Sequence, residues 1–359
     1  MVKFLTGINK PIFEGSYARD LGFNQFSGVK LWDQPYNDPP SIDLTTPDPS
    51  PPTPLLTTQP QLISEFFQQI QGVDIVRIWV FEGLEGIRFD AQKKIIGIDN
   101  HLLTNLTAIL DAANSHGVKV YLCLMNSWVV KNESPQGLPQ NRLNEYQRWN
   151  TTVKNIMKDI VNNPHDFVTS VLTPLVNQVA NHPAVYAIDV MNEPEGMIQD
   201  TPVVSIPSMR AYISQCCSVI RPRLKVSVGC MRSSTSESYS NLPVDFWDYH
   251  IYDETACLDP YRPGEYNNKP CLIGESGYAL YNTTIASRSA NEVQVARDFV
   301  EMSLNKGYSG CLVWTKDFTS DSNRALIIQW LKQFAGSNNQ VRPAPAISFW
   351  EWLRSLFGR

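Results

Sequence analysis

Two apolar stretches of the chain each end in a glutamate. Residues 187–194 are AIDVMNEP and residues 270–275 are PCLIGE, so each run presents a carboxyl group where the apolar pattern stops. Proline directly after Glu193 is typical of a strand that ends there, because proline cannot donate to a ladder. Two carboxyl groups at strand ends can act as a pair, one held protonated and the other ionised. Glu193 and Glu275 are therefore predicted to be the catalytic pair of a retaining glycoside hydrolase.

Polar or aromatic side chains stand at or near the ends of nearly all the other predicted strands. In a barrel of parallel strands the carboxyl ends share one rim, so residues that are distant in sequence meet there. Each residue alone is weak evidence, but the set at matching positions indicates one substrate-binding site. Its members are Asn24, Arg77, Asn126, Trp128, Asn192, His250, Tyr252 and Trp314.

Structural roles compete with catalytic ones for several of these residues. Arg77 would pair with a structural carboxylate, His250 would be a satisfied core histidine, and Trp128 would pack within its loop. For Glu193 and Glu275 this alternative is weak, because burying unpaired carboxylates at strand ends is costly. Glu82, Glu85 and Glu195 are expected to be loop charges, with a contact to a distal subsite as the alternative for Glu82. Asp189 and Asp248 are expected to lie inside the barrel or to be structural.

The elements that must position these residues alternate between strand and helix patterns. No hairpin signal separates the strands, which requires parallel strands with crossovers. No glycine-rich nucleotide turn follows the first strand, which favours a closed barrel over an open sheet. The sequence thus predicts an α/β fold, a (β/α)8 TIM barrel, as a single domain over residues 1–359. The predicted strands cover 20–26, 74–81, 118–124, 185–191, 225–229, 246–251, 271–274 and 310–314, and the predicted helices 61–71, 102–116, 144–161, 167–180, 208–220, 292–305, 322–334 and 347–356.

Three segments lie outside this alternation. Residues 3–15 are predicted to form a hairpin whose turn is residues 7–11 and which plugs the bottom of the barrel. The proline-rich segment 33–60 is predicted to be a long loop after strand one, where Trp32 and Tyr36 would meet sugar. The aromatic stretch 349–357 is interpreted either as a last helix packed on the barrel or as a helix that docks on a membrane surface or a partner.

The charge and composition of the chain argue against several classes of binding partner. A formal net charge of −5 argues against nucleic acid and anionic membranes, and no run is long enough to span a membrane. The seven cysteines contain no Cys-x-x-Cys pair, and no metal-ligand cluster is evident, so neither a metal nor an organic cofactor is called for. No signal-peptide pattern is visible at the start of the chain, so we expect a protein that is cytoplasmic or already stripped of its signal.

The strand-end motifs resemble those of the clan A glycoside hydrolases, in particular the family 5 cellulases and β-mannanases, over nearly the whole barrel. The resemblance implies that Glu193 is the acid/base and Glu275 the nucleophile. It also implies that Asn192 binds the sugar 2-hydroxyl and that Arg77 keeps Glu275 ionised. Tyr252 would hydrogen-bond Glu275.

The same resemblance assigns the remaining rim residues to substrate. His250 would contact substrate or the acid/base, and Trp314 would form the floor of the subsite at the scissile bond. The sequence around Arg77, Asn126 and Trp128 resembles β-mannanases most, which favours an endo-β-1,4-glycanase acting on oligo- or polysaccharide.

Three alternatives remain at this point: an exo-acting β-glycosidase, a transglycosylase and a non-catalytic carbohydrate-binding barrel. A retaining mechanism predicts carboxyl groups roughly 5 Å apart. It also predicts a raised pKa for Glu193, through burial and the nearby charge of Glu275.

Overall fold

A computed structural model describes residues 3–13, 18–26, 46–131, 140–231, 241–252, 268–277, 292–314 and 321–337. Its centre is a closed barrel in which neighbouring strands run parallel, in the order β1-β10-β9-β8-β7-β6-β5-β2. The predicted (β/α)8 TIM barrel is confirmed. The strands are β1 (Leu5–Lys10), β2 (Ile75–Trp79), β5 (Lys119–Cys123), β6 (Val185–Asn192), β7 (Val226–Cys230), β8 (Trp247–Ile251), β9 (Cys271–Ser276) and β10 (Gly310–Trp314).

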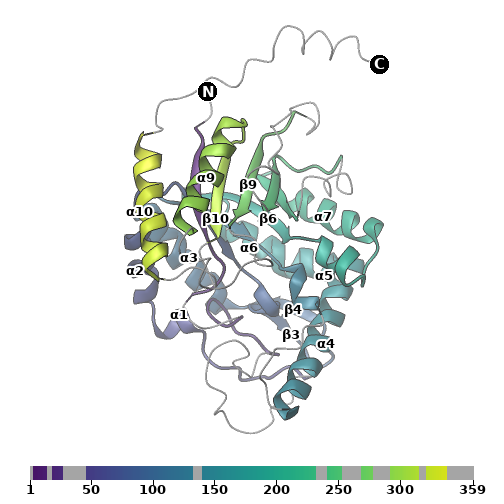
Figure 1. The fold of residues 1–359 in the computed structure, drawn as a ribbon. Helices are drawn as coiled ribbons and strands as arrows, with labels where there is room; N and C mark the ends of the chain where they lie inside the picture. Colours follow the sequence, from purple (N-terminus) through teal and green to yellow (C-terminus); the bar gives the residue numbers. More distant parts are fainter. Residues whose placement is uncertain are drawn as a thin grey trace, which may run out of the picture.

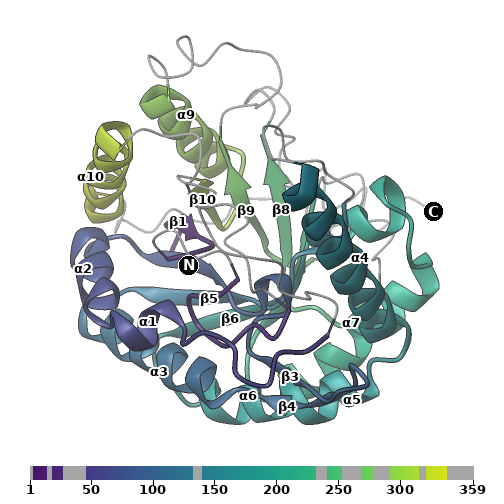
Figure 2. The same cartoon turned by 90° about the horizontal axis from the view of Figure 1, so that it is seen from below.

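Helices lie outside these strands, as the view from below shows (Figure 2). Figure 1 shows α9 and α10 side by side at one flank. Within the described part of the chain, no helix is long and apolar enough to cross a membrane. The helices are α1 (Leu55–Thr58), α2 (Gln61–Ile70), α3 (Asn100–Ser115), α4 (Gln140–Asn162), α5 (His165–Phe167), α6 (Thr173–Val179), α7 (Ile206–Ile220), α9 (Glu292–Asn305) and α10 (Asp321–Ser337), with short 3-10 or π turns at η1 (Glu82–Leu84), η2 (Ser127–Val130), η3 (Val168–Leu172) and η4 (Gly196–Asp200).

The barrel interior changes from apolar to polar along the strands. Side chains two residues apart point to the same face of a strand, so each interior position is followed by another one step nearer the rim. Ile75 is followed by Arg77, Ala187 by Asp189, and Phe246 by Asp248 and then His250. The lower layer is a separate apolar cluster of Ile75, Tyr121, Ala187, Phe246, Leu272 and Leu312.

The N-terminal strand corrects one prediction. Leu5–Lys10 is not a hairpin that plugs the barrel but β1, which pairs in parallel with β10 and β2. Gly7 is not in a turn. It lies within the strand, where a Cβ would stand 2.4 Å from the carbonyl oxygen of Ile75. The glycine therefore permits close strand packing, a role that sequence alone does not distinguish from a turn.

The segment predicted as strand one, residues 20–26, is irregular instead. Three of its backbone amides donate hydrogen bonds to carboxylates. Glu85 accepts from the amides of Leu21 and Gly22, and Asp99 accepts from the amide of Phe23. Those donors are therefore unavailable to a neighbouring strand.

Several smaller features complete the comparison with the sequence. An antiparallel pair that was not predicted, β3 (Ile87–Phe89) and β4 (Ile95–Ile98), lies between β2 and α3. Of the proline-rich segment 33–60, the part from residue 46 onward is described and contains the short helix α1, whereas residues 27–45, with Trp32 and Tyr36, lie outside the described residues. The aromatic stretch 349–357 also lies outside them.

Candidate active site

The two glutamates predicted to be catalytic lie at the same rim of the barrel. Glu275 is within β9, and Glu193 follows β6 directly. The backbone of Glu193 has φ +45°, a left-handed conformation that non-glycine residues seldom adopt, and its amide donates to the carbonyl of Gly229 on β7 at 2.7 Å. Such strain is common at functional sites and persists where the surrounding structure fixes it.

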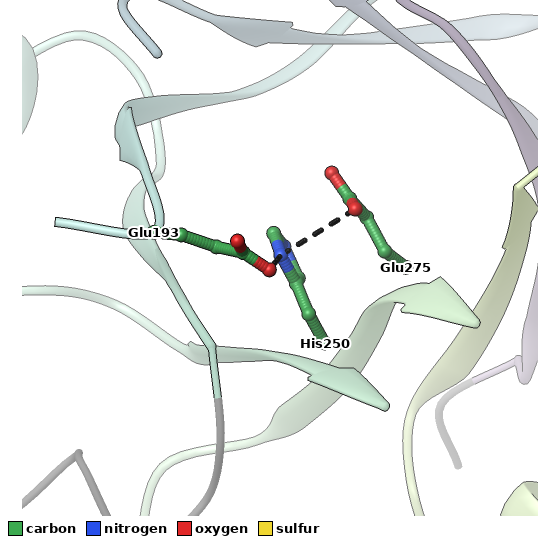
Figure 3. A group of neighbouring side chains, drawn as sticks. All are labelled: Glu193, His250 and Glu275. Carbon is green, nitrogen blue, oxygen red and sulfur yellow. Dashed lines mark hydrogen bonds and ion pairs between the residues drawn. The ribbon is translucent and has the colours of Figure 1, made fainter. Parts of the chain in front are cut away.

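The imidazole of His250 lies between the two carboxyl groups (Figure 3). Its Nδ1 is 2.8 Å from Oε1 of Glu193 and 3.6 Å from Oε2 of Glu275. One atom from each of the three side chains lies within 4.8 Å of the others. The carboxyl groups are thus close enough for direct attack, because inverting enzymes leave roughly 6.5–9.5 Å for a water molecule.

Arg77 joins Glu275 to the polar interior of the barrel. Its fully buried guanidinium donates to Oε1 of Glu275 at 2.5 Å, to Asp189 at 2.6 Å and to Asn192 at 2.9 Å. These carboxylates favour the protonated guanidinium and raise the Arg77 pKa despite burial. Arg77 therefore fixes one oxygen of Glu275 and supplies a permanent positive charge beneath it.

Tyr252 holds the other oxygen of Glu275. Its hydroxyl donates to Oε2 at 2.5 Å. Burial, followed by the charge of Glu275, raises the Tyr252 pKa well above its ordinary value, so the phenol keeps its proton and remains a donor. Each oxygen of Glu275 therefore has its own donor, and the carboxylate is held in one orientation.

Asn192 is oriented from both ends of its amide. Its Oδ1 accepts from Arg77, and its Nδ2 donates to Oδ1 of Asn126 at 3.0 Å. Asn126 in turn donates to Glu82 at 3.3 Å. The structure thus places Asn126, predicted to bind substrate, behind Asn192 as a support.

Trp128 contacts the acid/base candidate directly. Its indole Nε1 donates to Oε2 of Glu193. It is held in η2, where its backbone amide donates to Asn126 at 3.1 Å. Neither packing within the loop nor contact with sugar, the two roles considered from the sequence, anticipates this hydrogen bond.

Trp314 ends β10 on the side of the rim near Glu275. Its ring lies 5.8 Å from that of Trp79 at the end of β2, at an angle of 50°. Gly277 lies between Trp314 and Tyr252, with a hypothetical Cβ only 3.4 Å from the tyrosine ring. Trp314 is partly exposed, which leaves part of its surface available to a sugar ring.

Asn24 is the predicted site residue that the structure places elsewhere. Its amide donates to the carbonyl of Gly83 and accepts from the amide of Phe26, so it holds two loops together. The asparagine at the end of the N-terminal strand is Asn9 of β1. Asn9 donates to the carbonyl of Gly274 at 3.0 Å and accepts from Arg77 at 3.3 Å. It was missed because its segment was predicted to be a hairpin.

The proton distribution at Glu193 also differs from the expectation. Burial would raise the pKa of Glu193, but the hydrogen bond and charge of His250, with the Trp128 donor, lower it. Burial would lower the pKa of His250, but the charge of Glu275 and the bond to Glu193 raise it to about 9. The expected rise for Glu193 is therefore wrong in the free protein, because it included burial and Glu275 but omitted His250.

Five further acids were assigned roles from the sequence, and all five are buried. Asp189 and Asp248 lie inside the barrel as expected, and burial raises the pKa of Asp248 to about 7. Glu82, Glu85 and Glu195 are buried too, so their prediction as loop charges is wrong. Burial and the neighbouring charge of Asp20 raise the pKa of Glu85 well above its ordinary value.

The spacing of Glu193, His250 and Glu275 would also suit a metal ion, and no other such group occurs among the described residues. Arg77 already neutralises Glu275, however, and Nδ1 of His250 is hydrogen-bonded to Glu193. The positive charge that an ion would supply is therefore already provided by the protein.

No protein-family model matches the chain. In sequence it is similar to the mannan endo-1,4-β-mannosidase of Mytilus edulis, at 24% identity over an alignment of 379 positions, gaps included, which covers 92% of this chain and 88% of that protein. A protein of the same name from Cryptopygus antarcticus is 25% identical over 328 residues, 75% of this chain and 77% of that protein.

Solved structures show the same fold. A β-mannanase from the blue mussel Mytilus edulis has a TM-score of 0.61 and 19% identity, covering 92% of both chains. A β-1,4-mannanase from the sea hare Aplysia kurodai has a TM-score of 0.62 and 18% identity, covering 95% of both chains. Together with the sequence similarities, they confirm the resemblance to the family 5 glycoside hydrolases that the strand-end motifs indicated.

Proposed function

We infer that this protein is a retaining glycoside hydrolase related to the family 5 mannanases, and that it cleaves β-1,4-linked mannan within the chain. The observation that carries this proposal is the placement of Glu193 and Glu275, with one oxygen of each within 4.8 Å of the other at the rim of the barrel. The two curated relatives, both named mannan endo-1,4-β-mannosidase, support the substrate and the endo action.

In the proposed first step, Glu275 attacks the anomeric carbon while Glu193 delivers a proton to the glycosidic oxygen. Arg77 and Tyr252 each donate to one oxygen of Glu275, which orients the nucleophile. In the second step, water attacks the glycosyl-enzyme and Glu193 takes a proton from that water. Two displacements retain the configuration.

Two further residues would bind the sugar at the scissile bond. Asn192 uses one amide hydrogen for Asn126, so its second hydrogen is available to the sugar 2-hydroxyl, and Arg77 fixes the amide in that orientation. Trp314 would provide the apolar surface on which the sugar ring stacks.

We further propose that the whole chain is one catalytic domain. The first and last strands of the described chain, β1 and β10, pair with each other and close the barrel. Helix α10, which follows β10, packs against α9 and β1. An element at the end of the described chain therefore shares the core with the first strand.

A panel of β-1,4-mannan, cellulose derivatives, xylan, β-1,3-glucan and aryl β-glycosides tests the proposed function. Wild type is expected to lower the viscosity of mannan rapidly and to release the β-anomer first in NMR spectra. Glu193→Gln and Glu275→Gln should abolish this activity. Glu301→Gln, the same change at an exposed position of α9, should retain it.

Two outcomes would overturn the assignment. Cleavage confined to chain ends or to aryl glycosides would replace the endo-mannanase with an exo-acting β-glycosidase. Mannan hydrolysis that survives in both glutamine variants would mean that the reaction takes place elsewhere.

A further inference from the structure

Both oxygens of Glu193 face nitrogen donors. Nδ1 of His250 lies 2.8 Å from Oε1, and Nε1 of Trp128 donates to Oε2. An indole nitrogen can only donate, so Oε2 accepts. The single proton of the remaining contact belongs either to Oε1 of Glu193 or to Nδ1 of His250.

The surroundings of His250 decide where that proton resides. The same Nδ1 lies 3.6 Å from Oε2 of Glu275, so the nitrogen faces two carboxyl groups. On the opposite side of the ring, Nε2 lies 3.9 Å from Oδ1 of Asp248, and both atoms are buried. Three acids thus surround the imidazole, and each of them, when ionised, favours the protonated imidazolium form of His250.

Close packing fixes His250 and Asp248 in this arrangement. A Cβ on Gly274 would stand 1.9 Å from Oδ1 of Asp248, and one on Gly229 would stand 3.0 Å from Nε2 of His250. Arg77 and Tyr252, the other titratable donors described at the rim, are hydrogen-bonded to other groups. Arg77 donates to Glu275, Asp189 and Asn192, and Tyr252 donates to Glu275.

We propose that in the free enzyme the proton required by the leaving group is stored on His250, with Glu193 ionised, and that Trp128 is the positioning residue that holds Glu193 in that form. This inference rests on the proposed function, since it concerns the proton of the same reaction.

The reaction balances with this arrangement. In the first step one proton leaves Nδ1 of His250 and, through Glu193, forms an O–H bond on the leaving oxygen. The glycosidic C–O bond breaks and an oxygen of Glu275 forms the ester with its electron pair, so His250 ends neutral. In the second step water adds OH to the anomeric carbon and its proton returns through Glu193 to His250, while the ester bond breaks.

The raised pKa of His250, about 9, agrees with this geometry. NMR of protein labelled with ¹⁵N-histidine tests it without any substrate. The His250 signal, assigned by its loss in His250→Asn, should show an imidazolium at pH 7 that loses its proton near pH 9. In Glu193→Gln the midpoint should fall by a pH unit or more, because a charged partner is lost.

The pH dependence of kcat/KM on manno-oligosaccharide tests the role in the reaction. The basic limb of wild type should fall near pH 9, where the pair loses its shared proton. In His250→Asn that limb should move at least two units toward acid. In Trp128→Phe it should move up to about one unit toward base, because Glu193 loses a donor that favours its ionised form.

A matched control separates this effect from general disturbance. Trp330→Phe makes the same change on α10, where the ring packs on Phe334, and should leave the basic limb of the pH profile in place. A merely structural role for Trp128 would lower kcat without moving the basic limb, and that result would overturn the inference. A His250 signal that is neutral at pH 7 would overturn it too.

Failure of the proposed function gives a different pattern. If the His250 imidazolium persists to about pH 9 but mannan and its oligosaccharides are not cleaved at any pH, the proposed substrate is wrong. The stored proton then remains a property of the site. If mannan is cleaved and the basic limb is the same in wild type, His250→Asn and Trp128→Phe, the stored proton is wrong and the proposed function stands.

Discussion

Replacing Arg77 with methionine should destabilise the fold strongly, because the guanidinium is the centre of a buried charge network. The side chain is fully buried and donates to Glu275 at 2.5 Å and Asp189 at 2.6 Å. Methionine fills a similar length but leaves both carboxylates without their cation. Breaking one buried ion pair in this way costs about 3–5 kcal/mol. We expect a loss of about 4 kcal/mol, or roughly a thousandfold in the folding equilibrium.

Equilibrium urea unfolding followed by tryptophan fluorescence measures this loss. The triple variant with Arg77→Met, Asp189→Asn and Glu275→Gln should recover most of it, because no unpaired charge remains. A loss below 1 kcal/mol in Arg77→Met at an unchanged m-value would refute the view that this network depends on Arg77.

Two further changes concern buried carboxyl groups. Burial raises the pKa of Asp20 to about 6, so the folded protein binds the proton of this carboxyl group more tightly than the unfolded chain does. The protonated carboxyl group therefore contributes its full stabilisation below about pH 4, and this contribution is lost as the pH rises through 6. Asp20→Asn should therefore gain on wild type, by up to about 3 kcal/mol, between pH 4 and pH 8 in urea unfolding, and an unchanged difference would count against it. Gly274→Ala should cost about 1–3 kcal/mol or more, because its Cβ would meet Asp248 at 1.9 Å, whereas Gly336→Ala in α10 has open space and should be neutral or stabilising. Thermal unfolding of the two alanine variants compares them directly, and equal midpoints would contradict the close packing at Gly274.

The barrel was predictable because its strands are short apolar runs that end in polar residues. Seven of its strands overlap segments that the sequence marked, from Ile75–Trp79 through Gly310–Trp314. The residues placed at those ends, among them Arg77, His250 and Glu275, do converge in the structure. Alternation and strand-end chemistry together locate such a site because parallel strands deliver their ends to one rim.

The missed features depend on contacts that the local sequence does not encode. Gly7 gives the same signal in a turn and within a tightly packed strand, so β1 and Asn9 were lost together. Glu85 resembles a loop charge until the backbone amides that it accepts from are known. The Trp128–Glu193 hydrogen bond joins side chains 65 residues apart. No periodicity reports such a contact.

Glu275 is proposed to form a covalent bond to the sugar. Mass spectrometry of the protein tests this most directly, after treatment with a 2-deoxy-2-fluoro-β-mannobiosyl fluoride, which slows release of the glycosyl-enzyme. One added mannobiosyl group is expected, carried by the peptide that contains Glu275 and absent from Glu275→Gln. An adduct on another residue, or no adduct in an enzyme that hydrolyses mannan with inversion, would rule out Glu275 as the nucleophile.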